Sequence, residues 1–159
     1  MINVKVQDFK SAFYQHMNRY FSNSSVSTIS DKLLLFYSVE CGLKYLILIL
    51  YKKRGYDDLQ DVLFENRPIL EQLSGKDGHD IIKLLKFLKN TKFKLNDLLT
   101  KRLDGKGKPE KICSKEYNQA WRYGIECEEQ REIEVELVLK DIIKYIKSEI
   151  VSNRIYSGR

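Results

Sequence analysis

Six residues of this chain have side chains that could do chemistry together, and they occur as three pairs: Glu40 and Lys44, His79 and Asp80, Arg122 and Tyr123. An arginine fork beside a stackable tyrosine suits a phosphate group or a nucleobase. The His-Asp pair lies where a helix is expected to begin, and helix N-termini attract anions. These residue types predict a ligand-binding site. No cofactor or metal ion is expected, because the cysteines lack metal-ligand spacing.

Each pair also has a purely structural interpretation. Glu40 and Lys44 are four residues apart with the acid first, which is the better order for an ion pair within one helix. His79 could bond to the backbone at a helix start, where an acid such as Asp80 is favoured in any case. A polar network that pins three helices together and a binding pocket are therefore both open interpretations.

Arg122 lies between two aromatic residues, Trp121 and Tyr123. Aromatic residues at helical spacing are typical of a core as well as of a ligand platform. Arg122 could itself pair with Glu40. Because charges inside an apolar helix require compensation, we expect Glu40, Lys44 and Arg122 to lie close together in space.

The net charge of +6 is unevenly distributed along the chain. The segment Lys83–Lys115 has eleven Lys and Arg against three Asp and Glu, and Glu126–Glu136 has six Glu against one Arg. This pattern predicts a polyanion-binding face or self-association through complementary charges, and a solvated surface is the remaining interpretation. The candidate contacts to a nucleic-acid backbone are Lys83, Lys86, Lys89, Lys92, Lys94, Lys101 and Arg102, with the first three expected to form a ridge.

A long apolar segment, Leu33–Tyr51, must position the first pair. It predicts a helix buried on most sides. A membrane span of this length would place a carboxylate and an ammonium near its centre, at about 3 kcal/mol each. We therefore expect a central helix of a water-soluble protein without membrane association. Three cysteines without a CxxC pair, and no secretion segment, predict a cytoplasmic location.

The remaining elements are also expected to be helical, in a single domain over residues 1–159. We predict an all-α, up-and-down bundle of four or five main helices, because breakers are few and no segment alternates with period two. Residues 1–29 would hold an N-terminal helix, over 4–21, and a loop that ends near Ser30, the expected N-cap of the central helix. The further expected elements are two short helices within 57–73, a helix over 79–88, a short helix over Leu95–Leu103, an exposed mobile loop over 104–111, and a last region capped by Ser114 that is either one bent helix or two helices broken near Gly124.

Three motifs occur in an order that resembles the HEPN superfamily. They are SVECGLKYLIL with its E-x-x-x-K, GHDIIKLLKFL with its His-Asp-Ile helix start, and AWRY with a long terminal helix after it. The resemblance covers roughly residues 31–150. It implies a helical bundle that often forms dimers. Many members are RNases of toxin–antitoxin, CRISPR or abortive-infection systems, whereas others bind RNA or nucleotides, or serve as assembly modules, without cutting.

This sequence departs from the RNase pattern of that superfamily. RNase members have an Arg followed after four to six residues by a His, and neither His16 nor His79 follows an arginine at this spacing. Cleavage without a metal needs a base and an acid, and histidine is the usual supplier. The family's Pro after Arg-Tyr is replaced by Gly124. We therefore expect no catalytic residues, with an active RNase that has a rearranged centre as the alternative.

Three classes of function remain open at this level. The leading hypothesis is a non-catalytic module that binds RNA, a nucleotide or a partner protein from the same operon, in a bacterial defence, toxin–antitoxin or mobile-element system. The others are the rearranged RNase and a purely structural subunit of a larger assembly. We also expect a homodimer, with Tyr117, Trp121 and Tyr123 as the apolar centre of its interface.

Overall fold

The structure, a computed structural model, describes residues 4–23, 25–52, 54–55 and 79–157 and is mostly helical there. The expected short helices within 57–73 lie outside the described residues. The α-helices of the described part are α1 (Val6–Phe21), α2 (Ile29–Leu50), α5 (Ile81–Phe87), α6 (Tyr117–Arg122) and α7 (Glu129–Ser157), with a short 3-10 helix, η1, at Ser114–Glu116. This helical class agrees with the prediction, although a small sheet accompanies it.

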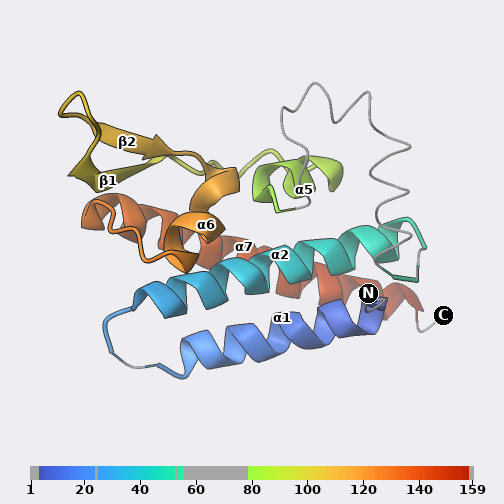
Figure 1. Ribbon diagram of the computed structural model, residues 1–159. Helices are drawn as coiled ribbons and strands as arrows, with labels where there is room; N and C mark the ends of the chain where they lie inside the picture. The colour runs from blue at the N-terminus through green and yellow to red at the C-terminus, as the bar shows by residue number, and fades with distance from the viewer. Residues whose placement is uncertain (1–3, 24, 53, 56–78, 158–159) are drawn as a thin grey trace.

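Helix α2 is the central element, and α1, α5, α6 and α7 all pack against it (Figure 1). Its first turn is closed by a capping box, in which Asp31 N donates to Thr28 Oγ1 and Thr28 N donates to Asp31 Oδ2. The N-cap is thus Thr28, and the expectation of Ser30 at this position was wrong by two residues. Leu35, Leu43 and Ile47 are completely buried, as the apolar sequence of this segment predicts.

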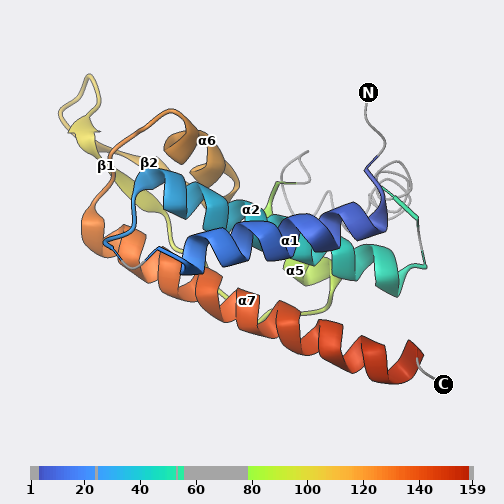
Figure 2. The same ribbon diagram turned by 90° about the horizontal axis from the view of Figure 1, so that it is seen from below.

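Helix α1 is the amphipathic N-terminal helix that the spacing of its apolar residues predicts. Its buried residues are Phe9, Phe13, Met17 and Tyr20, spaced three and four apart. It runs antiparallel to α2 after a short loop (Figure 2). The Ser38 hydroxyl donates a 2.9 Å hydrogen bond to the Phe13 carbonyl oxygen and so joins the two helices at their middle.

Helix α7 runs parallel to α2 along its length (Figure 2). Lys32, near the start of α2, pairs with Glu132 near the start of α7 at 2.6 Å. The predicted up-and-down bundle, in which neighbouring helices are antiparallel, therefore does not describe α2 and α7. The close approach of α2 to both α1 and α7 depends on Gly42. A Cβ added there would lie 2.8 Å from Phe13 of α1 and 2.9 Å from Ile146 of α7.

A two-stranded antiparallel sheet corrects the all-α prediction and the short helix expected over Leu95–Leu103. Strand β1 (Leu98–Leu103) pairs with β2 (Pro109–Ile112), with Leu98 opposite Ile112. The other edge of β1 bonds to the segment that precedes α7, through an isolated bridge between Thr100 and Cys127. The leucines at helical spacing suggested a helix, but pairing on both edges and burial of Leu98 favour a strand.

The turn of this hairpin corrects the mobile loop predicted over residues 104–111. Pro109 and the next residues belong to β2, and the turn before them is organised by one side chain. Asp104 Oδ1 accepts hydrogen bonds from the backbone N–H groups of Lys106, at 2.8 Å, and Lys108, at 2.9 Å. An Asp that bonds to its own turn in this way is a common means of closing a hairpin.

The last region of the chain is two helices, the second of the two alternatives. Helix α6 ends at Arg122, Gly124 follows the C-cap residue with φ of +66°, and Ile125 N donates to the Ala120 carbonyl oxygen at 2.9 Å. This is a Schellman motif, in which glycine accepts the left-handed conformation without a steric penalty. At the start of the region Cys113, and not Ser114, occupies the N-cap position of η1.

Helix α2 is the one helix of the described residues that is long and apolar enough to cross a membrane. Of its most apolar window, 67% is buried inside the protein. Core helices of soluble proteins pass the same test of length and composition, so this property alone does not assign a location.

Candidate functional site

The Glu40–Lys44 pair lies inside the protein on α2. Lys44 Nζ is 2.5 Å from Glu40 Oε1, and the two side chains are only 6% and 7% exposed. The ammonium also lies 6.0 Å from the centre of the Phe9 ring on α1. The expected intrahelical ion pair is therefore present, and it is buried where α1 and α2 meet.

His79 reaches the same carboxylate from the turn before α5. Its Nδ1 lies 3.0 Å from each oxygen of Glu40, although 39 positions separate the two residues in the sequence. The His79 side chain is 48% exposed, so it connects a buried carboxylate to the solvent. Two of the three predicted pairs thus contribute to one cluster through Glu40, Lys44 and His79.

Two opposing effects set the pKa of Glu40. Burial favours the neutral acid and raises the pKa. The hydrogen bond with His79 and the charge and hydrogen bond of Lys44 favour the carboxylate, and together they outweigh burial. The pKa of Glu40 is therefore below its ordinary value, and the cluster contains a carboxylate at neutral pH.

Asp80 serves the local structure. Its Oδ1 accepts hydrogen bonds from Ile82 N at 3.1 Å and from Lys83 N at 3.3 Å, which makes it the N-cap of α5. Asp80 is also buried. It therefore holds the start of the helix beside which His79 lies, and its carboxylate oxygens are partly engaged by backbone.

Arg122 and Tyr123 end α6, whereas they were expected to open the last helical region. Arg122 does not pair with Glu40. Its Nη2 donates a 2.7 Å hydrogen bond to the hydroxyl of Tyr37, one turn before Glu40 on α2. The Tyr37 hydroxyl and, less strongly, the Glu40 charge raise the pKa of the guanidinium further, so it is always charged. Tyr123 is 74% exposed, which excludes it from the core.

The sequence reasoning missed two residues of this region, Tyr37 and His16. The imidazole of His16, on α1, lies 6.3 Å from the Tyr37 ring, centre to centre. Burial lowers the pKa of His16, so its ring is neutral at neutral pH. The spacing of Tyr37, Glu40 and Lys44, at three and four residues, places them on one stripe of α2 and could have indicated Tyr37.

The structure divides the candidate nucleic-acid contacts into two groups. Lys83 is on the buried face of α5, where its long apolar stem packs against the core. It therefore does not form an exposed ridge with Lys86 and Lys89. Lys101 is 3.9 Å from Glu126, and Arg102 is 3.0 Å from Glu110, both on the exposed hairpin. The other four candidates, Lys86, Lys89, Lys92 and Lys94, are exposed and form no ion pair within the described residues.

Two glutamates of the acidic stretch and two of the three aromatic residues proposed for a dimer interface are buried. Glu132 accepts a hydrogen bond from Trp121 Nε1 at 3.0 Å, and Glu136 accepts one from the Tyr20 hydroxyl at 2.7 Å. Tyr117 and Trp121 are buried in the core. The expectation that they form the apolar centre of an interface was therefore wrong, because these side chains already join helices within one chain.

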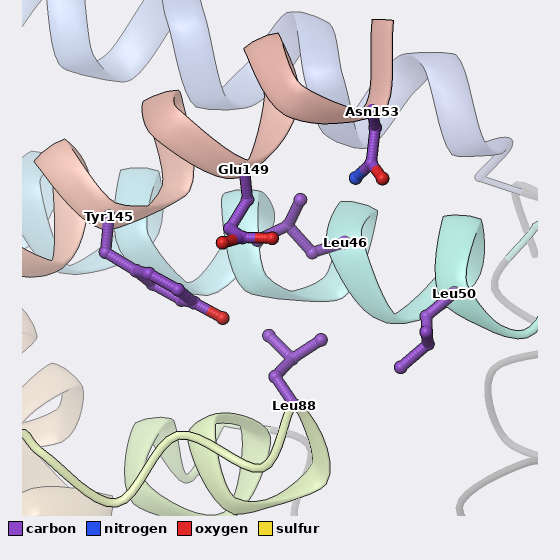
Figure 3. A pocket seen from close by; sticks show the side chains of 6 residues that line it. All are labelled: Leu46, Leu50, Leu88, Tyr145, Glu149 and Asn153. Atoms are coloured by element: carbon purple, nitrogen blue, oxygen red, sulfur yellow. The ribbon is translucent and has the colours of Figure 1, made fainter. Parts of the chain in front are cut away.

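A hollow of about 130 Å³ lies between the later turns of α2 and α7 (Figure 3). Tyr145, Glu149 and Asn153 of α7 face Leu46, Leu50 and Leu88 across it. Pockets for whole small-molecule ligands usually measure about 300–1,000 Å³. The hollow is too small for a nucleotide, and none of the predicted site residues lines it.

Among the described residues there is no group of three or more His, Cys, Asp or Glu side chains that could hold a metal ion. Comparisons with protein-family models, with curated proteins and with solved structures each found no match to this chain.

Proposed function

We propose that this chain is a helical module of HEPN type that binds the phosphate groups of RNA or of a nucleotide without cleaving RNA. The order of the three sequence motifs supports the superfamily and a role in a bacterial defence, toxin–antitoxin or mobile-element system. A cytoplasmic location without membrane association, and a partner protein from the same operon, belong to this proposal.

The charge balance around Glu40 is the observation that carries the proposal. The Lys44 ammonium compensates the Glu40 carboxylate inside the protein. Arg122 remains as an extra cation at the surface, and its hydrogen-bond partner among the described residues is the hydroxyl of Tyr37. A guanidinium without a carboxylate partner among the described residues is suited to a phosphate, which accepts two of its N–H groups at once.

Two further features of the described residues suit a nucleic acid. Tyr123 follows Arg122 directly and offers an exposed ring on which a base can stack. Lys86 lies in the last turn of α5, and Lys89, Lys92 and Lys94 follow the helix, all four exposed. Such lysines contact a phosphate backbone without reading its sequence, so binding is expected to be weak, sequence-tolerant and dependent on salt.

Fluorescence anisotropy with a short labelled single-stranded RNA tests this proposal. The logarithm of the binding constant should fall linearly with the logarithm of the salt concentration, and Arg122→Ala should reduce that slope by about 0.7. Lys147→Ala, which removes an exposed ammonium from α7, is the control for the same general change in charge. Binding that is insensitive to salt, or absent at low salt, would leave the purely structural role as the better explanation.

A second candidate function is an RNase with a rearranged centre. The observation that favours it is the contact of His79 Nδ1 with Glu40, because a carboxylate on one ring nitrogen orients a histidine base. The RNA incubated with the protein and a chelator should stay intact if our proposal is right. Cleavage that is lost in both His79→Ala and Arg122→Ala would establish the RNase instead.

Homodimerisation remains a prediction, now for a different surface. Ile133 and Leu137, one turn apart on α7, are 45% and 55% exposed. Sedimentation at micromolar concentration and two salt concentrations measures the mass. A monomer under both conditions would exclude the dimer, and a dimer that is indifferent to salt would indicate an apolar contact.

A further inference from the structure

Two side chains from two other helices reach Tyr37 of α2. Arg122, at the end of α6, donates its 2.7 Å hydrogen bond to the Tyr37 hydroxyl, and His16 of α1 lies beside the Tyr37 ring. These residues are far apart in the sequence, and only the packing of α1 and α6 on α2 brings them together. The arrangement combines a cation, a phenol and an imidazole at one half-exposed place.

The position of Tyr37 is fixed by the core. Its ring makes an edge contact with Phe36, which is completely buried, at 6.0 Å between ring centres. A hydroxyl held by such a ring restricts the guanidinium of Arg122 before any ligand arrives. Restricting a side chain in advance lowers the entropy lost on binding.

Arg122 keeps most of its capacity to bind an anion. A guanidinium has five N–H groups, and the contact with Tyr37 uses one of them. Because this partner is neutral, the positive charge is oriented without being neutralised. The carboxylate of Glu40 is compensated by Lys44 and lies inside the protein, so it does not occupy the guanidinium.

His16 adds a polar group from a second side. Its ring is half-buried and forms no hydrogen bond within the described residues. Because burial keeps the imidazole neutral at neutral pH, it presents one N–H donor and one acceptor nitrogen. Such a ring suits a phosphate oxygen or a sugar hydroxyl.

We infer that Arg122, Tyr37 and His16 form the phosphate subsite of this module, in which Arg122 binds one phosphate group of a nucleotide unit, Tyr37 positions the guanidinium, and His16 donates to the same group from α1. Tyr123 then offers its ring to the base of that unit. The inference rests on the proposed function and adds to it the residues that hold the anion. The phosphate can belong to a free nucleotide or to an RNA backbone.

The test uses anisotropy with the labelled RNA and three conservative variants of the full chain. Tyr37→Phe keeps the ring and removes the hydroxyl, His16→Gln keeps a polar group, and Arg122→Lys keeps the charge without the fork. Each of the first two should weaken binding about fivefold, the size of one lost hydrogen bond, and Arg122→Lys about tenfold. Tyr145→Phe, at the hollow, is the matched control and should bind as the unaltered protein does.

Competition identifies the ligand source. If uridine monophosphate displaces the labelled RNA as efficiently as a longer unlabelled RNA does, the subsite binds a free nucleotide. If only the longer RNA displaces it, the subsite binds an RNA backbone. Uridine without a phosphate should not compete, and competition by it would overturn the phosphate subsite.

The failures of the inference and of the proposed function are distinguishable. If Arg122→Ala weakens binding and reduces its salt dependence but Tyr37→Phe and His16→Gln do not weaken binding, this subsite is wrong and the proposed function stands. If the unaltered protein binds no RNA and no nucleotide at low salt, both are wrong. The emission of the buried Trp121, the single tryptophan of the chain, verifies that each variant is folded.

Discussion

Lys44 Nζ lies 2.5 Å from Glu40 Oε1, and both side chains are more than nine-tenths buried. The pair is therefore more than a surface ion pair, which would contribute little to stability. It removes two charges from water in the middle of the central helix. Four predictions about the fold depend on the stability of this region and of the helix contacts around it.

Glu40→Gln should lower the free energy of unfolding by about 3 kcal/mol, because the buried ammonium of Lys44 loses the carboxylate that lies 2.5 Å away. The double variant Glu40→Gln/Lys44→Met should recover a large part of this loss, since the buried ammonium is removed together with the carboxylate. Urea unfolding followed by Trp121 fluorescence measures both. A double variant as unstable as the single one would show that the ion pair is not the source of the effect.

The pH dependence of stability follows from the lowered pKa of Glu40. In the unfolded chain the carboxyl titrates near its ordinary value of 4.5, and in the folded protein it titrates lower. The ionised carboxylate, faced by Lys44 and His79, therefore stabilises the fold above pH 4.5, and this contribution is lost as the pH falls through the folded-state pKa. The stability difference between the unaltered protein and Glu40→Gln should shrink as the pH falls below 4.5. A difference that grows as the pH falls below 4.5 would contradict the lowered pKa.

Glu132 should be far more important for stability than its neighbour Glu134. Its carboxylate binds both Lys32, at 2.6 Å, and Trp121 Nε1, at 3.0 Å, and so joins α2, α6 and α7. Glu132→Ala should cost about 2–3 kcal/mol, because it leaves two buried donors unpaired. Glu134→Ala, two positions along the same helix, is the control and should change stability by less than about 0.5 kcal/mol. Equal effects in urea unfolding would mean that α7 tolerates loss of this network.

Gly42→Ala should destabilise the protein although alanine favours helices. The new methyl group would lie 2.8 Å from Phe13 and 2.9 Å from Ile146, so α1 and α7 would have to move apart. Overpacking of this kind costs about 1–3 kcal/mol, and the gain in helix propensity returns about 1 kcal/mol. We expect a net loss of about 1 kcal/mol in thermal or urea unfolding. A more stable variant would indicate that this helix contact is looser than the structure describes.

Part of the site could be predicted from the sequence because charged residues in an apolar helix are conspicuous. Glu40 and Lys44 required partners, and the helix start at His79 supplied one. Tyr37 and His16 were missed because an aromatic residue and a histidine at helical spacing resemble core residues. Arg122 was identified, but its partner was not, since the contact depends on how α6 ends at Gly124.

The helices could be predicted better than the hairpin, for a physical reason. Helix α1 is determined by local periodicity, whereas β1 is determined by pairing with β2 and with the segment before α7. Lys83 was likewise predicted to be exposed but is buried. Sequence spacing predicts which residues share a helix face, but it does not predict which face other elements cover.

Mapping bound RNA onto the protein by nuclear magnetic resonance tests the central claim, that the module binds phosphate at Arg122, most directly. Isotope-labelled protein is titrated with the short single-stranded RNA at low salt, and the amide signals are followed. We predict that the largest shifts occur at Tyr37, Arg122 and Tyr123, with smaller ones at His16 and Asp80, and that Arg122→Ala strongly reduces them. Shifts confined to the hairpin or to the hollow beside Tyr145, or no shifts at all, would contradict this account.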